Sequence, residues 1–276
     1  MLYLKIDGTR IPKLGFGTWE LNDEAATESV LDALSMGYRH IDTAQAYGNH
    51  RAVGKALAQS GVPRKDIFLT TKIWMDNFRP QALHDSLDDS LEQLGTDRVD
   101  LLLLHWPNPE VPLAQTLEAL AKARDDGKTW LIGVSNFTTD LLDEAVEKSP
   151  VRLVTNQVEY HPYLNQEPVL ERVRRYDMSL TAYSPLGHGE VVGDSLLSRI
   201  GGKYGKSPCQ VALRWLIQQP EVLAIPKAEN REHAKENLDI FDFELTESEM
   251  EEIFGLARPD GRIIDPDHAP RWDNAA

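Results

Sequence analysis

The sequence predicts a closed barrel of eight parallel strands, each followed by a helix, with a hairpin before the barrel and one extra helix after it. From residue 14 onward, short runs of branched and leucine side chains alternate with amphipathic stretches, and eight such units can be counted. The nearest glycine cluster, KLGFGTW, lacks the third glycine of an open dinucleotide-binding sheet and leads into no immediate helix. A closed barrel is therefore favoured over an open sheet.

The predicted strands follow in order along the chain. Residues 1–11 alternate apolar and polar side chains around Asp7-Gly8, a dipeptide that favours a tight hairpin turn. Several of the later runs are apolar on both faces, as strands covered on both sides are. The eight barrel strands are predicted at 14–18, 38–43, 67–72, 99–105, 130–135, 153–158, 179–183 and 222–226.

Helices are indicated by apolar spacing and by capping signals. Four leucines repeat at helical spacing after the third strand: Leu83, Leu87, Leu91 and Leu94. Ser207 followed by Pro208 combines a capping hydroxyl with a proline suited to the first helical position. Thr246 and Glu249 form a capping box beyond the eighth unit, which predicts the extra helix.

Composition limits the partners and the compartment. The chain carries 44 acidic and 29 basic residues, a formal charge of −15, which opposes binding to nucleic acid or to anionic lipid. No run approaches the roughly 18 to 20 apolar residues of a membrane span. One cysteine, Cys209, allows no internal disulfide and no thiolate metal cluster. We expect one domain over residues 1–276 in a cytoplasmic monomer without a metal.

Unusual polar residues gather where the barrel strands end. Asp42 ends the second predicted strand, Tyr47 follows it, Lys72 ends the third strand and His105 ends the fourth. Each residue alone would usually be structural. Because the active site of such a barrel lies at the carboxyl ends of its strands, four polar residues at successive strand ends are expected to meet at one mouth.

These residue types suit proton transfer to a carbonyl oxygen. An ammonium beside a phenol favours the phenolate, so Lys72 is expected to lower the pKa of Tyr47 from about 10 while Asp42 orients the ammonium. His105 can hold a carbonyl oxygen between its imidazole and the phenol, where negative charge develops. The pattern predicts reduction of a carbonyl group with Tyr47 as the proton donor.

Eight segments in this order resemble the aldo-keto reductase family: GFGTWEL, RHIDTAQAYGNHRAVGKAL, TTKIW, LLLLHWP, IGVSNF, NQVEYHPY, AYSPLG and IPKAENREHAKENL. The resemblance spans nearly the whole chain. It implies NADPH-dependent reduction of aldehydes and ketones, and it puts Asp42, Tyr47, Lys72 and His105 on the catalytic tetrad of the family. The residues of these motifs and the short loops are most similar to those of the bacterial 2,5-diketo-D-gluconate reductase branch, whose members also reduce methylglyoxal.

The resemblance also implies the cofactor and substrate contacts. Tyr183 would stack on the nicotinamide ring, and the substrate would meet an apolar wall of Trp19, Trp74 and Trp106. The remaining implied cofactor contacts are Thr18, Ser135, Asn136, Gln157, Ser184, Leu186, Gly187, Pro226, Lys227, Ala228, His233, Glu236 and Asn237.

Two departures from the family pattern concern the 2′-phosphate of NADPH. Ala228 stands where serine is common, and His233 stands where arginine is often found. Histidine is largely uncharged near neutral pH and lacks the bidentate fork of arginine, so we expect that NADH is tolerated. We expect Lys227, with help from Asn230 and Arg231, to hold the phosphate. The short tail after Ile253 predicts an open rim around the substrate.

Two other functions were weighed against reduction. A barrel that binds the cofactor as a regulatory sensor without turnover would not need an intact tetrad. A metal-dependent hydrolase would need histidine and carboxylate ligands on several strand ends, which this sequence does not supply. Reduction of a small carbonyl compound is therefore the favoured prediction.

Overall fold

The computed structural model describes residues 1–273 and confirms the predicted barrel. All neighbouring strands of its eight-stranded sheet run parallel. The sheet closes where Leu14 bridges Ala224 and where the Gly17 N–H donates to Pro226 O at 3.0 Å. The strands are β3 (Phe16–Gly17), β4 (His40–Asp42), β5 (Phe68–Ile73), β6 (Val99–Leu104), β7 (Thr129–Ser135), β8 (Thr155–Glu159), β9 (Ser179–Tyr183) and β10 (Val222–Ala224).

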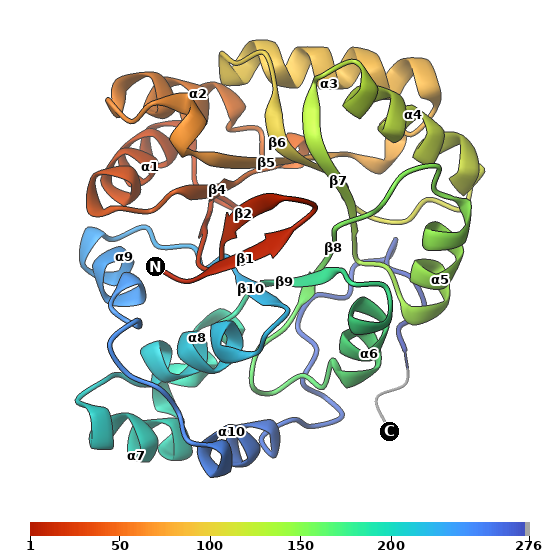
Figure 1. Cartoon of the computed structure of the whole chain (residues 1–276). Coiled ribbons are helices and arrows are strands. Elements are labelled where there is room, and N and C mark those ends of the chain that lie inside the picture. The colour runs from red at the N-terminus through yellow and green to blue at the C-terminus, as the bar shows by residue number, and fades with distance from the viewer. Residues whose placement is uncertain (274–276) are drawn as a thin grey trace.

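Helices surround the strands as an outer ring (Figure 1). They are α1 (Asp23–Met36), α2 (His50–Gln59), α3 (Pro80–Leu94), α4 (Leu113–Asp125), α5 (Thr139–Lys148), α6 (Glu167–Arg175), α7 (Ser195–Tyr204), α8 (Pro208–Gln218), α9 (Arg231–Leu238) and α10 (Glu247–Phe254). Four short 3-10 turns are η1 (Gln45–Tyr47), η2 (Arg64–Asp66), η3 (Met75–Asn77) and η4 (Gly187–Gly193). None of the helices in the described residues is long and apolar enough to cross a membrane.

The predicted capping signals are confirmed. Ser207 and Gln210 form a reciprocal capping box at the start of α8, and Thr246 and Glu249 form another at the start of α10. These side chains satisfy backbone N–H groups that have no partner inside the helix. The four leucines of α3 are buried against the sheet, so their helical spacing reports the face that packs.

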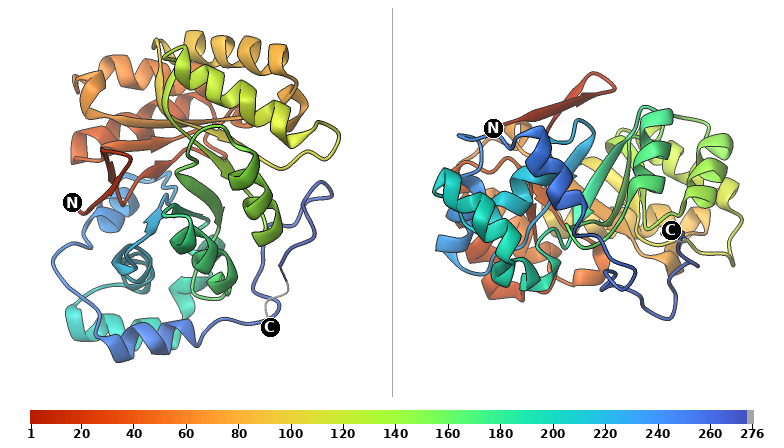
Figure 2. Two further views of the ribbon diagram at one scale, coloured as in Figure 1. Left: turned by 45° about the vertical axis from the view of Figure 1, so that its right-hand side comes forward. Right: turned by 90° about the horizontal axis from the view of Figure 1, so that it is seen from below.

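The N-terminal hairpin, β1 (Tyr3–Ile6) and β2 (Thr9–Pro12), closes the amino-terminal end of the barrel. Its turn residues Asp7 and Gly8 have positive φ, as a two-residue hairpin of this kind requires. Ile6 and Ile11 join a buried cluster with barrel residues that include Leu103. Figure 2 shows the hairpin and the chain after α10 on opposite sides of the molecule, so the hairpin does not cover the carboxyl ends of the strands.

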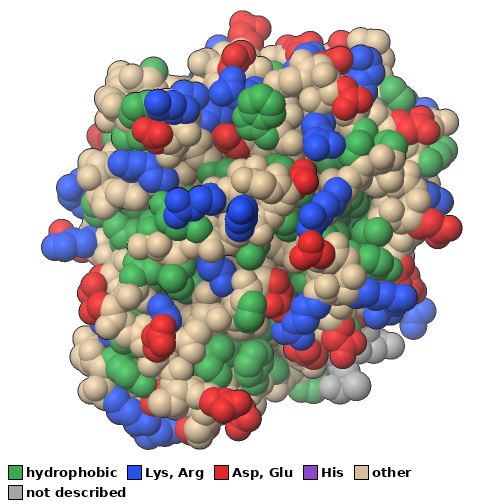
Figure 3. Space-filling model, in the orientation of Figure 1, with side chains coloured by type: hydrophobic (Ala, Val, Ile, Leu, Met, Phe, Trp, Pro, Cys, Tyr) green, Lys and Arg blue, Asp and Glu red, His purple; other side chains and the backbone are tan. Residues whose placement is uncertain are grey.

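The face around the hairpin carries no broad field of one charge. Lys and Arg side chains lie among Asp and Glu side chains over the surface seen in Figure 3. Because oppositely charged groups are interspersed there, the net charge of −15 is not concentrated on this face.

Candidate active site

The four residues of the predicted tetrad lie at the carboxyl ends of three neighbouring strands. Asp42 ends β4, Tyr47 ends the turn η1 that follows, Lys72 lies near the end of β5, and His105 directly follows β6. The Lys72 Nζ donates to Asp42 Oδ1 at 2.5 Å and to the Tyr47 hydroxyl at 3.1 Å. The rings of Tyr47 and His105 meet edge to face with their centroids 5.7 Å apart. The fold therefore brings all four side chains together.

The turn that carries Tyr47 is held in place by Gln45. The Gln45 Nε2 donates to Ser90 Oγ on α3 at 3.0 Å, and its Oε1 accepts from the Trp74 N–H at 2.8 Å. These bonds tie the loop after β4 to the helix and the loop that follow β5. The phenol is consequently fixed beside the ammonium of Lys72 by contacts outside the tetrad.

The pKa of Tyr47 shifts in the direction opposite to the prediction. Burial raises the pKa of the phenol above its ordinary value of 10, and the nearby Lys72 ammonium lowers it by less, while Asp42 raises it further. The expected net lowering was therefore wrong, because a phenolate here would lose hydration as well as gain a cation. Tyr47 holds its proton at neutral pH, which is the form of a proton donor.

Lys72 and Asp42 form a buried ion pair. Burial by itself lowers the pKa of Lys72, but the negative charge of Asp42 and the Tyr47 phenol outweigh it, so the pKa is raised above 10.5. Lys72 is 0% and Asp42 is 1% exposed. The ammonium therefore remains charged beneath the phenol and can stabilise negative charge that develops there.

His105 is a neutral imidazole. Burial first, and then the positive charge of Lys72 and the neighbouring His268, lower its pKa well below 6.5. Its ring Nδ1 is buried without a hydrogen-bond partner among residues 1–273. A neutral ring has one N–H donor, so His105 can donate to an oxygen without adding a charge to the site.

The next strand ends bring a ring and an amide beside the tetrad. The hydroxyl of Tyr183, at the end of β9, donates to Asn136 Oδ1 at 2.8 Å, and Asn136 Nδ2 donates to His105 O at 3.0 Å and to Ser135 Oγ at 3.2 Å. Asn136 has a φ of 64°, a left-handed conformation that asparagine tolerates well. The Tyr183 ring is therefore held in one orientation, as stacking on a planar nicotinamide requires.

Gln157 and Thr18 connect this group to Asp42. The Gln157 Nε2 donates to Asp42 Oδ2 at 2.8 Å, and its backbone O accepts from Ser135 Oγ at 2.8 Å. Thr18 Oγ1 donates to Asp42 O at 3.1 Å. Amide and hydroxyl groups from four strand ends thus converge next to the Tyr183 ring, and this donor and acceptor set fits a carboxamide-bearing aromatic ring.

The loop after β9 contains the residues predicted to line the pyrophosphate path, Ser184, Leu186 and Gly187. Ser184 and Gly187 have positive φ values of 46° and 54°. The Ser184 hydroxyl forms a 3.1 Å hydrogen bond with His188, whose ring lies 5.7 Å from the ring of Trp19. This loop therefore meets the loop after β3, and Trp19 borders the predicted cofactor path as well as the mouth.

Lys227, the predicted phosphate ligand, is already paired with carboxylates. Its Nζ lies 2.9 Å from Glu229 Oε1 and 3.6 Å from Glu20 Oε2. The side chains of Lys227 and Glu229 are 30% and 65% exposed, so solvent weakens this pair and a phosphate can compete for the ammonium. Sequence reasoning missed both acidic partners, although Glu229 lies only two residues from Lys227.

The remaining predicted contacts with the adenosine end lie near α9. His233 is exposed in the first turn of α9 and has no side-chain partner within residues 1–273. Arg231 instead pairs with Asp32 on α1. The other predicted contacts on this segment are Pro226 and Ala228, which are buried, Glu236, which is half-buried, and Asn237, which is buried.

The aromatic wall at the mouth includes residues that the sequence analysis did not select. The His268 ring lies 5.4 Å from the Trp74 ring and 4.9 Å from the Trp106 ring, and Trp272 lies 6.0 Å from Trp106. Trp106 is only 6% exposed. The prediction of an open rim was therefore wrong on this side, because the short tail packs directly on the wall.

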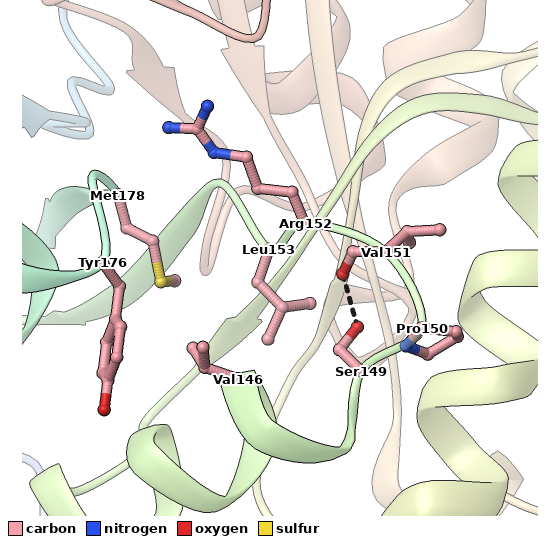
Figure 4. A pocket seen from close by; sticks show the side chains of 8 residues that line it. All are labelled: Val146, Ser149, Pro150, Val151, Arg152, Leu153, Tyr176 and Met178. Atoms are coloured by element: carbon pink, nitrogen blue, oxygen red, sulfur yellow. Dashed lines mark hydrogen bonds between the residues drawn. The ribbon is translucent and has the colours of Figure 1, made fainter.

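A separate cavity of about 290 Å³ lies away from this site, near the ends of α5 and α6 and beside Leu153 just before β8 (Figure 4). Ser149 Oγ donates to Val151 O at 2.6 Å within its rim. Met178 and Tyr176 face it from the segment before β9, at the amino-terminal ends of the strands. The cavity contains none of the tetrad residues, and its position opposite the strands' carboxyl ends separates it from the candidate active site.

Comparison with known proteins identifies the class that this barrel and site define. Residues 13–258 match the family model of the aldo/keto reductase family, and the chain belongs to that family. It is therefore an oxidoreductase that reduces carbonyl groups with a nicotinamide cofactor.

Particular relatives share most of this chain. It is 40% identical over 269 residues to an aldo-keto reductase of Mycolicibacterium smegmatis, covering 97% of this chain and 96% of that one. It is 39% identical over 267 residues to methylglyoxal reductase DkgB of Escherichia coli O157:H7, covering 95% and 99%. A solved structure assigned as a 2,5-diketo-D-gluconic acid reductase B superposes with a TM-score of 0.97 at 49% identity, covering 99% and 98%.

Proposed function

We propose that the protein reduces small aldehydes, α-dicarbonyls and keto-sugar acids such as 2,5-diketo-D-gluconate with NADPH, and that Tyr47 is the general acid. The observation that carries the proposal is the Tyr47 hydroxyl, which accepts a hydrogen bond from the buried ammonium of Lys72 and lies beside the neutral ring of His105. Relatives named for methylglyoxal and for 2,5-diketo-D-gluconic acid support the substrate class.

The reduced nicotinamide supplies a hydride when it is bound. With a hydride delivered to the carbonyl carbon, Tyr47 would give its proton to the carbonyl oxygen, so that an alcohol forms. The Tyr47 phenolate would then regain a proton from water. Tyr47 and His105 hold the oxygen before transfer, and the Lys72 ammonium stabilises the negative charge left on the phenol. Asp42 keeps that ammonium in place.

The nicotinamide end of the cofactor would be held by four residues at the strand ends, namely Ser135, Asn136, Gln157 and Tyr183. The Tyr183 ring offers a stacking face, and the polar side chains offer groups for the carboxamide. Because the hydrogen bond to Asn136 sets the orientation of the Tyr183 ring, a nicotinamide stacked on that ring would be held in one orientation next to the tetrad. The distance between the transferred hydride and the carbonyl carbon would then be set by where the protein holds the cofactor and the substrate.

The residues that would bind the adenosine end of the cofactor favour NADPH only moderately over NADH. Lys227 would bind the 2′-phosphate, but it must leave Glu229 and Glu20 to do so, and His233 supplies no permanent charge. Glu236 and Asn237 would contact the adenine. We propose that NADH is also accepted.

The test is the absorbance of reduced cofactor during incubation with methylglyoxal, a nitrobenzaldehyde and 2,5-diketo-D-gluconate. At least one compound should be turned over by the parent protein, and Tyr47→Phe serves as the matched control that removes a single oxygen. Cofactor binding with no turnover of any compound would contradict the proposal and favour a regulatory sensor.

A further inference from the structure

Glu159 is a buried carboxylate that the proposed chemistry does not use. It ends β8, is 0% exposed, and pairs in register with Tyr183 on β9. Its Oε1 accepts from His161 Nε2 at 2.9 Å and from the Ile263 N–H at 2.8 Å, and its Oε2 accepts from the Ile264 N–H at 2.9 Å. A fully buried carboxylate requires such partners, and two of these three come from the chain after α10.

The segment after α10, residues 258–273, is called the strap below. Its first part is docked on the loop after β8. The Arg258 N–H donates to Tyr163 O at 3.1 Å, and a Cβ at Gly261 would lie 1.8 Å from that same oxygen. Only glycine permits this approach. Together with Glu159, these contacts form the first anchor of the strap.

Asp273 forms a second anchor at the other end of the strap. Its Oδ1 accepts from Thr139 Oγ1 at 2.7 Å, and its Oδ2 accepts from the Thr139 N–H at 3.0 Å. Thr139 is the first residue of α5, so the carboxylate also lies at the positive end of a helix. The strap is therefore fixed to the barrel at both ends.

Between its anchors the strap lies against the mouth of the site. The His268 ring packs on the rings of Trp74 and Trp106. Arg262 lies over the Trp272 ring at 3.7 Å, and Trp272 Nε1 donates to Asp265 at 2.8 Å, so the strap also has internal contacts. Figure 2 shows this segment as a loop that leaves α10 and runs along the molecule opposite the hairpin.

We propose that Glu159 and Asp273 are positioning residues for substrate binding: they hold the strap so that His268 completes the carbonyl pocket against Trp74 and Trp106. Neither carboxylate touches the reacting atoms. Each acts through the strap, which places the His268 ring against the rings of Trp74 and Trp106. The inference rests on the proposed function only in taking the occupant of the pocket to be a carbonyl compound.

The experiment weakens each anchor separately. Asp273→Ala removes the half-exposed anchor and should fold normally, whereas Glu159→Gln keeps the size of the buried side chain but loses its charge. Asp267→Ala is the matched control, because Asp267 is an exposed carboxylate of the same strap with no hydrogen bond or ion pair within the described residues. Hydrogen exchange over residues 258–273 reports whether the strap stays docked.

Both anchor variants should exchange faster over the strap and should bind small carbonyl compounds more weakly. If the strap remains docked in about a third to a tenth of the molecules, KM for methylglyoxal rises about three- to tenfold. Because the tetrad is untouched, kcat should change less than KM, and the dissociation constant of NADPH should be unchanged in Asp273→Ala. The Asp267→Ala control should match the parent in exchange and in KM.

His268→Ala separates the proposed mechanism from a general loosening of the protein. If the anchor acts by placing His268, Asp273→Ala should raise KM in the parent but add little in the His268→Ala background, because the two changes remove the same contact. Equal KM values for the parent and Asp273→Ala despite faster exchange, or full additivity of the two changes, would overturn the inference. Failure of the proposed function is a different result, namely a parent protein that turns over no carbonyl compound.

Discussion

Replacing Lys72 with methionine should destabilise the protein strongly as well as inactivate it. The Lys72 Nζ and Asp42 Oδ1 atoms lie 2.5 Å apart, and both side chains are almost fully buried. With an effective dielectric constant of about 20, unit charges at that distance attract by about 7 kcal/mol, which is partly offset by their lost hydration. Removal of one partner from a buried pair typically costs about 3–5 kcal/mol.

Lys72→Met would leave Asp42 with the Gln157 amide as a remaining side-chain partner, at 2.8 Å. Equilibrium urea unfolding at pH 7 should show the loss, and the double variant Asp42→Asn/Lys72→Met should recover most of it because no buried charge remains. Neither variant should reduce methylglyoxal at the parent rate. A double variant no more stable than Lys72→Met would refute the reasoning, since the cost would then come from packing rather than from an uncompensated charge.

Three further changes test other parts of the molecule. Tyr47→Phe should lower kcat by about 10² to 10⁴ and leave the dissociation constant of NADPH, measured by fluorescence quenching, unchanged. His233→Arg should tighten NADPH by about 10- to 150-fold for one charge-assisted bond without affecting NADH, and an unchanged ratio of the two dissociation constants would show that this side chain does not face the phosphate. Burial lowers the pKa of Lys13 from 10.5 to about 8. Between pH 8 and pH 10.5 Lys13 binds more protons in the unfolded chain than in the native protein. The free energy of unfolding therefore increases with pH, by about 3 kcal/mol across this pH range. Lys13→Met should remove that increase in urea unfolding at pH 7.5, 8.5 and 9.5, and an identical pH dependence in both proteins would contradict the assignment.

Local signals in the sequence were sufficient to predict the barrel. Apolar periodicity, the Asp7-Gly8 turn, the capping hydroxyl of Ser207 before Pro208 and the capping box of Thr246 and Glu249 depend on residues close together in the chain, and the structure has each of them. The strand ends were less exact: the strand predicted at 222–226 ends at Ala224. The helix α7 was not predicted.

The four residues of the predicted tetrad could be brought together from the sequence, because the topology of such a barrel places successive strand ends at one mouth. To place Asp42, Lys72 and His105 at this mouth, it was enough to assign the strands that they end or follow. The pKa of Tyr47 could not be predicted in the same way, because its direction is the sum of burial, one cation and one anion at particular distances. Sequence reasoning counted the ammonium and omitted the burial.

The position of the strap depends on contacts between distant parts of the chain. Ile263 and Glu159 are 104 residues apart in the sequence, and Asp273 and Thr139 are 134 apart. The strap has no helical or alternating pattern, so its only local signal was the presence of the His268 and Trp272 rings among many charged residues. The barrel and the approximate positions of its strands could be read from the sequence, because they follow from short-range periodicity. The packing of His268 on Trp74 and Trp106 and the pairing of Lys227 with Glu20 could not be read from the sequence, because they depend on contacts between segments that only folding brings together.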